Sequence, residues 1–284
     1  MKVCIDLGAT NIKGARMVNG AIVAETCTPT GHGSHQAVVA SLTRAIEGLL
    51  VPGTDAIAIA SAGDIDEARG VCTYATPNLE GFTGFDFAAY ASETFGLHCT
   101  AINDACAALL GEMCDGVGKN MKDRRVVMLT LGSGVGGAYW KDGSLAGSPA
   151  NDHARFGHYC LEADGKLCNC GRRGCVEQYL SGRALNRMAR ERGLQPEGYL
   201  LQARHGDRAA RAMVADFICL LERALCIIAQ RCPFDVCILG GGVAEGIART
   251  LPSMLSELSF RTVFAELGNR AGLFGAYRFA ESKL

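Results

Sequence analysis

The pattern of apolar and polar positions divides the chain into two similar halves. Residues 3–22 (VCIDLGATNIKGARMVNGAI) and residues 127–145 (VMLTLGSGVGGAYWKDGSL) each contain an apolar strand, a glycine-rich turn, a second strand, a tight turn and the start of a third strand. With a one-residue gap, Gly8 matches Gly132. Short strands joined by Asn-Gly and Asp-Gly are typical of β-hairpins. The pattern therefore predicts a duplicated α/β fold with a cleft between its two halves.

Each half continues with segments of helical periodicity and short apolar strands. The predicted helices are 35–50, 85–96, 104–114, 181–192, 209–231 and 271–282, and the predicted strands are 56–63 and 98–103. Residues 235–247 predict a strand, a glycine turn and a helix in succession. We place the boundary near residue 115, so that residues 1–115 form an N-terminal α/β lobe and residues 116–270 a C-terminal one. The final helix, 271–284, is expected to pack back on the first lobe.

Charge and hydropathy exclude several classes of protein. The 28 basic and 29 acidic residues are interspersed and give a net charge of −1, so no basic field would attract nucleic acid or an anionic membrane. Residues 1–3 lead directly into a strand pattern, and no apolar run approaches the roughly 18 residues of a membrane span. These features predict a cytoplasmic protein.

The 14 cysteines are informative in such a protein, because cytoplasmic thiols stay reduced. Cys99, Cys219, Cys226 and Cys237 have apolar neighbours, and we expect them to be small buried residues. Only the cysteines in residues 168–175 are dense enough to need another explanation.

Three glycine-rich segments are candidates for binding a nucleotide. Glycine allows backbone N–H groups to approach phosphate oxygens, and an acid among them can hold Mg²⁺ through water beside a polyphosphate. Each segment alone is weak, since most glycine-rich hairpins are only turns, but three in this order favour the binding role. Neither a Walker lysine loop nor a Rossmann G-x-G-x-x-G is present. The candidate residues are Asp6 (with Mg²⁺), Gly8, Ala9, Thr10, Asn11 and Lys13; Gly132, Ser133, Gly134 and Val135; and Gly241 and Gly242 at the nucleoside end.

Asp104 follows a predicted strand and begins a predicted helix. An Asn or Asp at this place is a common N-cap, worth about 1 kcal/mol, and from the local sequence alone capping is the better explanation. The alternative is a general base for phosphoryl transfer, which needs a carboxylate within hydrogen-bond reach of the accepting hydroxyl. One carboxylate can do both, with one oxygen for each task.

Cys168, Cys170 and Cys175 have C-x-C-x₄-C spacing, and His158 lies ten residues before the first of them. Three thiolates and an imidazole suit tetrahedral Zn²⁺. A disulfide would leave one cysteine unpaired, a redox pair is more often C-x-x-C, and a nucleic-acid zinc module would bring a basic face. The spacing therefore predicts a structural zinc site, closed by four protein ligands.

These motifs together resemble a known family. The segments DLGATNIKG, INDACAALLGE, LGSGVGG, FGH, CNCGRRGCVE and ILGGGV occur in the order and spacing of the ROK family of bacterial sugar kinases, in the actin-like ATPase superfamily. The resemblance covers nearly the whole chain. It implies a two-lobed actin-like (ribonuclease H-like) α/β fold, transfer of a phosphoryl group from ATP with Mg²⁺ to the 6-hydroxyl of a hexose or N-acylhexosamine, and a homodimer.

The resemblance also implies roles for individual residues. Asp104 would be the catalytic base and Asn103 would bind the sugar. His158 and Glu177 would contact sugar hydroxyls, so that zinc braces the loop that carries them. Further sugar contacts are candidates at Asn78 and Gly63, although the loop after Asn78 is equally compatible with an ordinary turn.

One position departs from the family pattern. Most relatives have a glutamate that binds the sugar ring near its C1 and C2 hydroxyls, where this chain has Arg155. Arginine has only donors, so it cannot replace those contacts. Either Arg155 points away, or the substrate presents an acyl carbonyl or an acid there, which leaves glucose and N-acetylmannosamine both open. A sugar sensor without kinase activity is the alternative function; a DNA-binding repressor is disfavoured, because no winged helix precedes the first strand.

Overall fold

The computed structural model describes most of the chain, and the described residues divide into two compact units. They are residues 1–76, 79–146 and 155–283. Unit 1 takes its described residues from 1–120 and 270–283, and unit 2 takes them from 121–146 and 155–269.

The sheet of unit 1 has five strands in the order β3-β2-β1-β4-β7. Strands β1, β4 and β7 are parallel to one another, and β2 and β3 extend the sheet as antiparallel neighbours. The bounds are β1 Lys2–Leu7, β2 Asn11–Val18, β3 Ala21–Pro29, β4 Ala56–Ser61 and β7 His98–Asn103.

The sheet of unit 2 repeats this arrangement in the order β10-β9-β8-β11-β12. Its strands β8, β11 and β12 are parallel, and β9 and β10 are antiparallel. The bounds are β8 Val126–Leu131, β9 Val135–Lys141, β10 Ser144–Leu145, β11 Val236–Gly240 and β12 Thr262–Phe264. The predicted duplicated α/β fold is confirmed, strand by strand.

The two tight turns of the repeat have the same backbone conformation. Asn19 and Gly20 have φ angles of 48° and 79°, and Asp142 and Gly143 have 52° and 77°. Positive φ at both central residues belongs to the type I′ turn, whose twist matches the flanking strands. The Asn-Gly and Asp-Gly pairs therefore fix the strand register in both units.

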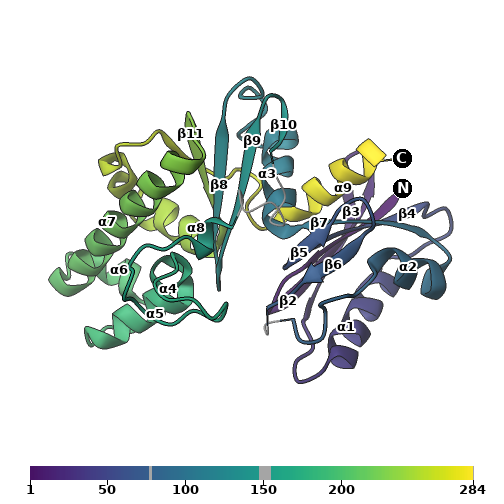
Figure 1. Cartoon of the computed structure of the whole chain (residues 1–284), viewed down its shortest axis with the longest axis horizontal. Coiled ribbons are helices and arrows are strands. Elements are labelled where there is room, and N and C mark those ends of the chain that lie inside the picture. The colour runs from purple at the N-terminus through teal and green to yellow at the C-terminus, as the bar shows by residue number, and fades with distance from the viewer. Residues whose placement is uncertain (77–78, 147–154, 284) are drawn as a thin grey trace. The chain divides into compact units, whose positions relative to one another are not determined.

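Helices follow the strands in both units (Figure 1). Unit 1 contains α1 His35–Glu47, α2 Phe87–Phe95, α3 Asp104–Asp115 and α9 Ala271–Lys283. Unit 2 contains α4 Glu177–Leu180, α5 Gly182–Glu191, α6 Tyr199–Arg204, α7 Arg208–Arg231 and α8 Gly241–Thr250. Every helix expected from periodicity is present within a few residues. The short α6, the hairpin of β5 Asp64–Asp66 and β6 Val71–Tyr74, and strand β12 are additional, being too short to show a period. No helix in the described ranges is long and apolar enough to cross a membrane.

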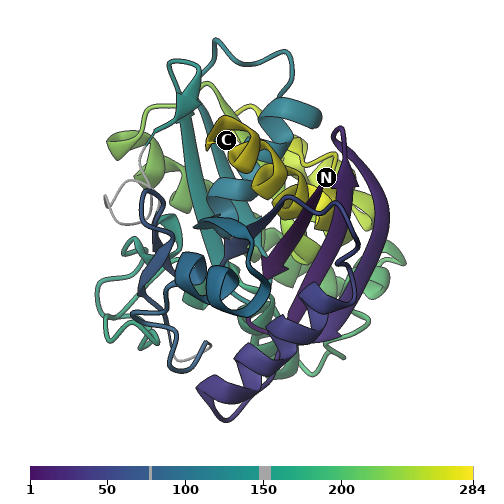
Figure 2. The ribbon, with the colours of Figure 1, turned by 90° about the vertical axis from the view of Figure 1, so that its right-hand side faces the viewer.

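Each unit has its own apolar core. In unit 1, Leu42 and Ile46 of α1 pack with Ile5 of β1, and α1 lies along the curved purple strands in Figure 2. In unit 2, Phe217 and Leu221 of α7 belong to the same buried cluster as the strand residues of β8. The apolar stripe of each helix thus covers its own sheet.

The expectation for the dispersed cysteines was half right. Cys99 and Cys237 are buried on strands, but Cys219 and Cys226 are exposed. The latter two are seven residues apart on α7, which places them on one face of the helix, opposite the buried Phe217. The prediction for Cys219 and Cys226 was wrong because it relied on apolar residues next to them in the sequence. In a helix, adjacent residues lie on different faces, so an apolar neighbour can be buried while the cysteine is exposed. All 14 cysteines lie in the described ranges, and none of them forms a disulfide there.

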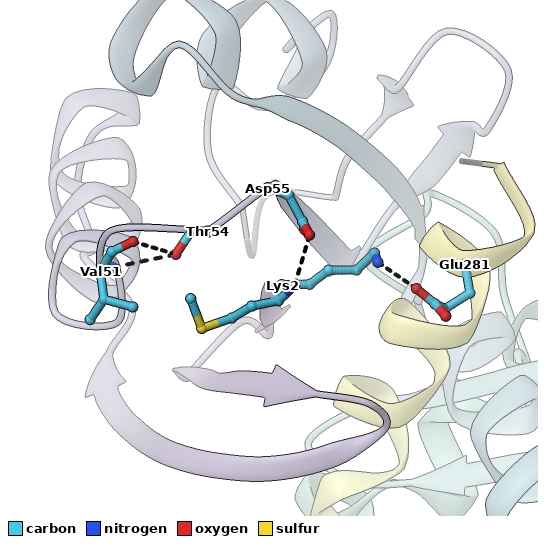
Figure 3. Close-up of polar contacts among 6 residues, drawn as sticks. Lys2, Val51, Thr54, Asp55 and Glu281 are labelled. Atoms are coloured by element: carbon cyan, nitrogen blue, oxygen red, sulfur yellow. Dashed lines mark hydrogen bonds and ion pairs between the residues drawn. The ribbon is translucent and has the colours of Figure 1, made fainter.

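The N-terminus is fastened to two other segments of unit 1 (Figure 3). The α-amino group of Met1 lies 2.7 Å from Asp55 Oδ2, in the turn before β4. Lys2 Nζ forms an ion pair with Glu281 of α9, and Lys2 is buried. Strand β1 is thereby held beside the last helix of the chain.

Helix α9 packs against α3 through glycines. A Cβ atom on Gly275 would lie 1.7 Å from the Ala107 carbonyl oxygen, and one on Gly111 would lie 2.4 Å from the Ala271 carbonyl oxygen. Arg278 also donates to Asp115, with Nε 2.7 Å from Oδ2. The absence of side chains at the two glycines allows the two backbones to come this close.

We expect Gly275→Ala to lower the free energy of unfolding by about 3 kcal/mol, because its methyl group would meet backbone that cannot move aside cheaply. Gly48→Ala is the matched control, since its Cβ would lie 3.4 Å from the nearest atom, an ordinary contact. Urea denaturation of both variants measures the difference. Equal midpoints for the two would contradict the close α3–α9 packing.

Candidate active site

The first part of the candidate site lies at one edge of the unit 1 sheet. The parallel strands β1, β4 and β7 end in register, with Leu7 beside Ser61 and Ser61 beside Asn103. Because the carboxyl ends of parallel strands share an edge, Asp6 and Asp104 are brought together there from distant parts of the sequence. Asp6, the predicted Mg²⁺-binding residue, and Asp104, the predicted base, thus lie at the same edge of the unit 1 sheet.

Asn103, and not Asp104, is the principal N-cap of α3. Its Oδ1 accepts from the N–H groups of Ala105 and Cys106 at 3.0 and 3.1 Å, which also fixes the orientation of the amide. Its Nδ2 donates to the Gly63 carbonyl at 2.9 Å and to Asp104 Oδ1 at 3.1 Å. The local expectation of an Asp104 cap is corrected, because Asp104 is the first helical residue. Asn103 holds Asp104 in place, whereas its contact with a sugar remains a prediction.

One oxygen of Asp104 carries its structural hydrogen bonds. Oδ1 accepts from the Ala105 N–H at 2.8 Å as well as from Asn103. The side chain is anchored through one oxygen, and Oδ2 is the oxygen that could take a proton from a substrate.

Both acids at this edge hold their protons more tightly than usual. Burial, and then the charge of Asp6, raises the pKa of Asp104 to about 6. Burial likewise raises the pKa of Asp6, although Lys13 opposes this from 3.6 Å. Two half-buried carboxylates that repel each other favour a cation between or beside them. The residues present therefore fit Mg²⁺ at Asp6.

A glycine of α9 lets Asp6 lie against that helix. A Cβ on Gly272 would lie 3.1 Å from the Asp6 carboxyl carbon. Sequence reasoning missed Gly272, because its significance depends on α9 returning to β1 from the far end of the chain. The GLFG segment alone resembles any small-residue stretch of a helix.

Three carbonyl groups of the turn between β1 and β2 accept hydrogen bonds. The Gly8 N–H bonds to the Asn11 carbonyl at 3.1 Å, and Thr30 donates to two more: its Oγ1 to the Gly8 carbonyl at 2.7 Å and its N–H to the Thr10 carbonyl at 3.0 Å. Thr30 is buried and was not anticipated. With these three carbonyls engaged, the N–H groups of Ala9 and Thr10 suit an anion better than a cation.

The turn between β8 and β9 is built in the same way. The Gly132 N–H bonds to the Gly134 carbonyl at 3.0 Å. The Gly132 carbonyl accepts from Gly182 at 2.7 Å, and the Ser133 carbonyl accepts from Arg183 Nε at 2.8 Å. This similarity extends the repeat from strand order to hydrogen bonding.

Glu177, two residues after Cys175, contacts the turn between β8 and β9. Its Oε2 accepts from the Val135 N–H at 3.1 Å, and a Cβ on Gly134 would lie 2.5 Å from the same oxygen. The predicted sugar-binding acid therefore also caps the predicted phosphate-binding turn. No sequence pattern indicated this contact, because 42 residues separate the two partners.

The third glycine segment begins α8 against the end of β8. Gly241 has a φ of 84°, and a Cβ there would lie 2.5 Å from the Leu131 carbonyl oxygen. The N-cap position is Gly240, and within the described residues no side chain caps the helix. The N–H groups of its first turn suit a polar ligand, as predicted for Gly241 and Gly242.

The predicted zinc ligands converge in unit 2. One ligand atom from each of His158, Cys168, Cys170 and Cys175 lies within 4.8 Å of the other three. The Cys170 and Cys175 Sγ atoms are 3.6 Å apart, and Cys168 Sγ is 3.7 Å from His158 Nδ1. Tetrahedral Zn²⁺ with bonds of about 2.3 Å to sulfur separates its ligand atoms by roughly this much. The donor set and its spacing fit a closed zinc site.

The loop that carries these ligands depends on two glycines. Gly171 and Gly174 have φ angles of 82° and 71°, and a Cβ on Gly174 would overlap the Glu162 carbonyl oxygen, at 1.6 Å. Burial raises the pKa of Cys170, but hydrogen bonds, first those from Arg172, lower it overall. Burial and the neighbouring sulfurs raise the pKa of Cys175, so the thiols of the cluster do not share one tendency to ionise.

The remaining predicted positions have mixed placements. Asn78 lies outside the described residues. Gly63 has a φ of 106°, and its Cβ would lie 2.6 Å from the Tyr74 carbonyl, so the β5–β6 hairpin already explains this glycine. Arg155 precedes the short helix Phe156–His158 and is half-buried.

Paired strand–turn–strand units with glycine turns define an actin-like α/β protein. Comparison with known proteins agrees: the ROK family profile matches residues 2–283. A glucokinase of Streptomyces coelicolor is 30% identical over 310 residues, covering 97% of this chain and 96% of that protein. An N-acetylmannosamine kinase of Salmonella typhimurium is 28% identical over 291 residues, covering 98% of each.

A solved structure gives the same result. The ROK family glucokinase from Streptomyces griseus, in complex with glucose and AMPPNP, has a TM-score of 0.83 and 27% identity, and the match covers 99% of both chains. The chain belongs to the ROK family, as its motifs predicted, and the relatives named above are sugar kinases.

Proposed function

We propose that this protein is an ATP-dependent kinase that transfers the γ-phosphoryl group to the 6-hydroxyl of a hexose or an N-acylhexosamine. The observation that carries the proposal is the pair of acids in unit 1, with Asp104 anchored through one oxygen and its pKa raised to about 6. A base with a pKa near the working pH is what abstraction of a hydroxyl proton needs.

The nucleotide would be held by the glycine segments. The N–H groups of the β1–β2 and β8–β9 turns, with Thr10 and Lys13, would bind phosphate oxygens, and the start of α8 would accept the nucleoside end. Mg²⁺ at Asp6 would neutralise charge on the transferring group. The sugar would be oriented by Asn103, His158 and Glu177, with Asn78 and Gly63 as further candidates.

Zinc would fix the positions of His158 and Glu177, which are proposed to contact the sugar. If Nδ1 of His158 ligates the metal, Nε2 lies on the other side of the ring and can donate to a hydroxyl. Glu177 follows Cys175 by two residues, so a fixed cysteine loop also fixes the start of α4. The metal would be a brace and would not take part in the phosphoryl transfer.

Arg155 bears on which sugar is used. Because its guanidinium can only donate, it suits a substrate with an acceptor at that corner, such as the carbonyl of an N-acyl group. The glucokinase and N-acetylmannosamine kinase relatives have similar identity to this chain, so both substrates belong in the test.

A coupled ADP-release assay over glucose, mannose, allose, fructose, N-acetylmannosamine and N-acetylglucosamine tests the proposal. We expect turnover with at least one of them at micromolar to millimolar KM. Sugar binding without turnover on the whole panel would instead support the sensor alternative and contradict the kinase.

A further inference from the structure

The charges around the β8–β9 turn are unbalanced for a site that binds phosphate. Glu177 places a carboxylate against the turn, with Oε2 accepting from the Val135 N–H. A carboxylate at this distance repels a polyphosphate that approaches the same backbone. A cation on the turn is therefore needed to offset it.

Arg183 supplies that cation from the first turn of α5. Its Nε donates to the Ser133 carbonyl at 2.8 Å, so the guanidinium is fixed beside the turn, and the side chain is exposed. Among the described residues, this is the only hydrogen bond of Arg183, which leaves both terminal nitrogens free to donate. They form the fork that suits phosphate oxygens.

The backbone of the turn points to the same ligand. The carbonyls of Gly132, Ser133 and Gly134 are all engaged, whereas the N–H groups of Ser133 and Gly134 have no hydrogen-bond partner within the described part of the chain. Two N–H groups without a partner in the described residues, beside a fixed guanidinium, make a compact anion site.

We propose that Arg183 is a nucleotide-binding residue whose terminal nitrogens contact the terminal phosphates of ATP. This rests on the proposed function, because it takes the β8–β9 turn as a phosphate-binding turn. It adds a side chain that no motif of the sequence indicated. Arg183 also explains how Glu177 can cap the turn without expelling the phosphates.

The test measures binding of AMPPNP with Mg²⁺ by calorimetry at several KCl concentrations, in the absence of sugar. We expect Arg183→Ala to weaken AMPPNP binding about tenfold, the loss of a charge-assisted hydrogen-bonded contact, and to reduce the salt dependence of the affinity. Arg183→Lys keeps the charge and should retain much of the affinity and the salt dependence. Arg190→Ala, an exposed arginine on the same helix, is the matched control and should behave as the wild type.

Steady-state assays then separate the two substrates. Arg183→Ala should raise KM for ATP about as much as it weakens AMPPNP binding, and should leave KM for the sugar unchanged. Equal losses in the alanine and lysine variants, with unaltered salt dependence, would mean that Arg183 only holds the turn, and would overturn the inference. So would an affinity of Arg183→Ala equal to that of Arg190→Ala. A wild-type protein that binds no AMPPNP would overturn the inference and the proposed ATP dependence together, whereas tight wild-type binding with no effect of Arg183→Ala would overturn the inference alone.

Discussion

Asp104→Asn should lower kcat by about three orders of magnitude while the protein stays folded, because a general base contributes 10²–10⁴-fold. The amide oxygen of asparagine can keep the hydrogen bonds from Ala105 and Asn103 that Oδ1 now accepts. The basicity and the negative charge are lost, while these contacts stay. The coupled ADP-release assay measures this with the sugar that the panel identifies.

Asp86→Asn is the matched control for the same chemical change in the same unit. Asp86 caps α2 by accepting from the Ala89 N–H, and asparagine is an equally good N-cap. Wild-type activity in Asp86→Asn and its loss in Asp104→Asn would assign the base. Activity within a few-fold of the wild type in Asp104→Asn would exclude that role.

The raised pKa of Asp104 also predicts how activity changes with pH. The base must be ionised, so kcat/KM should fall tenfold per pH unit below an apparent pKa near 6. Mg²⁺ held by Asp6, as proposed, would offset the repulsion between the two acids, so the acid limb of kcat, measured on the full complex, should lie at lower pH. An acid limb of kcat/KM near pH 4 would contradict the buried, repelled carboxylate.

The same shift has the opposite consequence for stability. The folded protein binds the Asp104 proton more tightly than the unfolded chain, since the pKa rises from 3.8 to about 6. Stability contributed by this group is therefore present at low pH and is lost as the pH rises from about 4 to 6. Above pH 6, Asp104→Asn should exceed the wild type in unfolding free energy by roughly 2 kcal/mol, and the difference should vanish at pH 4. Urea denaturation at the two pH values checks the sign.

Loss of the metal should be the second large effect. We expect the purified protein to contain about one zinc per chain, and Cys170→Ser to contain almost none, because the four protein ligands close the site. KM for the sugar should rise by an order of magnitude or more, since His158 and Glu177 lose their support. Elemental analysis and the kinase assay provide the two readouts.

Cys160→Ser is the control for that experiment. Cys160 is exposed, and its backbone pairs with Cys175, but its side chain is outside the ligand cluster. It should retain both zinc and activity. Full activity in metal-free wild-type protein, or a wild-type zinc content in Cys170→Ser, would contradict the proposed structural role of zinc.

Zinc removal should also affect nucleotide binding at the β8–β9 turn of unit 2. Glu177 caps the Val135 N–H, so a loosened α4 start withdraws that cap from the β8–β9 turn. We expect the loss of the turn's shape to outweigh the relief from the Glu177 charge, so that the zinc-free protein, with Mg²⁺ restored, binds AMPPNP more weakly, by a smaller factor than it loses in sugar binding. Chelation that alters sugar affinity alone would show that the turn keeps its shape without Glu177.

Local patterns in the sequence were sufficient for features that depend on residues close together in the chain. Alternation and helical periodicity predicted the paired meanders, and Asn-Gly and Asp-Gly predicted turns whose φ angles are all positive. The convergence of His158 and the three cysteines was also predictable, because they lie within 18 residues and two glycines with positive φ lie between the last two cysteines. The motifs that resemble the ROK family then indicated how these elements are arranged in an actin-like fold.

Tertiary structure decided what depends on partners far apart in the chain. The division of labour between Asn103 and Asp104, the raised pKa that Asp6 causes, and the glycine at 272 all follow from β1, β7 and α9 meeting at one edge. The solvent exposure of Cys219 and Cys226 depended on which face of α7 meets the core. A sequence window records which residues are near in the chain, whereas electrostatics and packing depend on which are near in space. For this protein the sequence by itself determined the elements, the cluster of one histidine and three cysteines, and the family, and only the folded chain decided how the acids and the glycine turns are held.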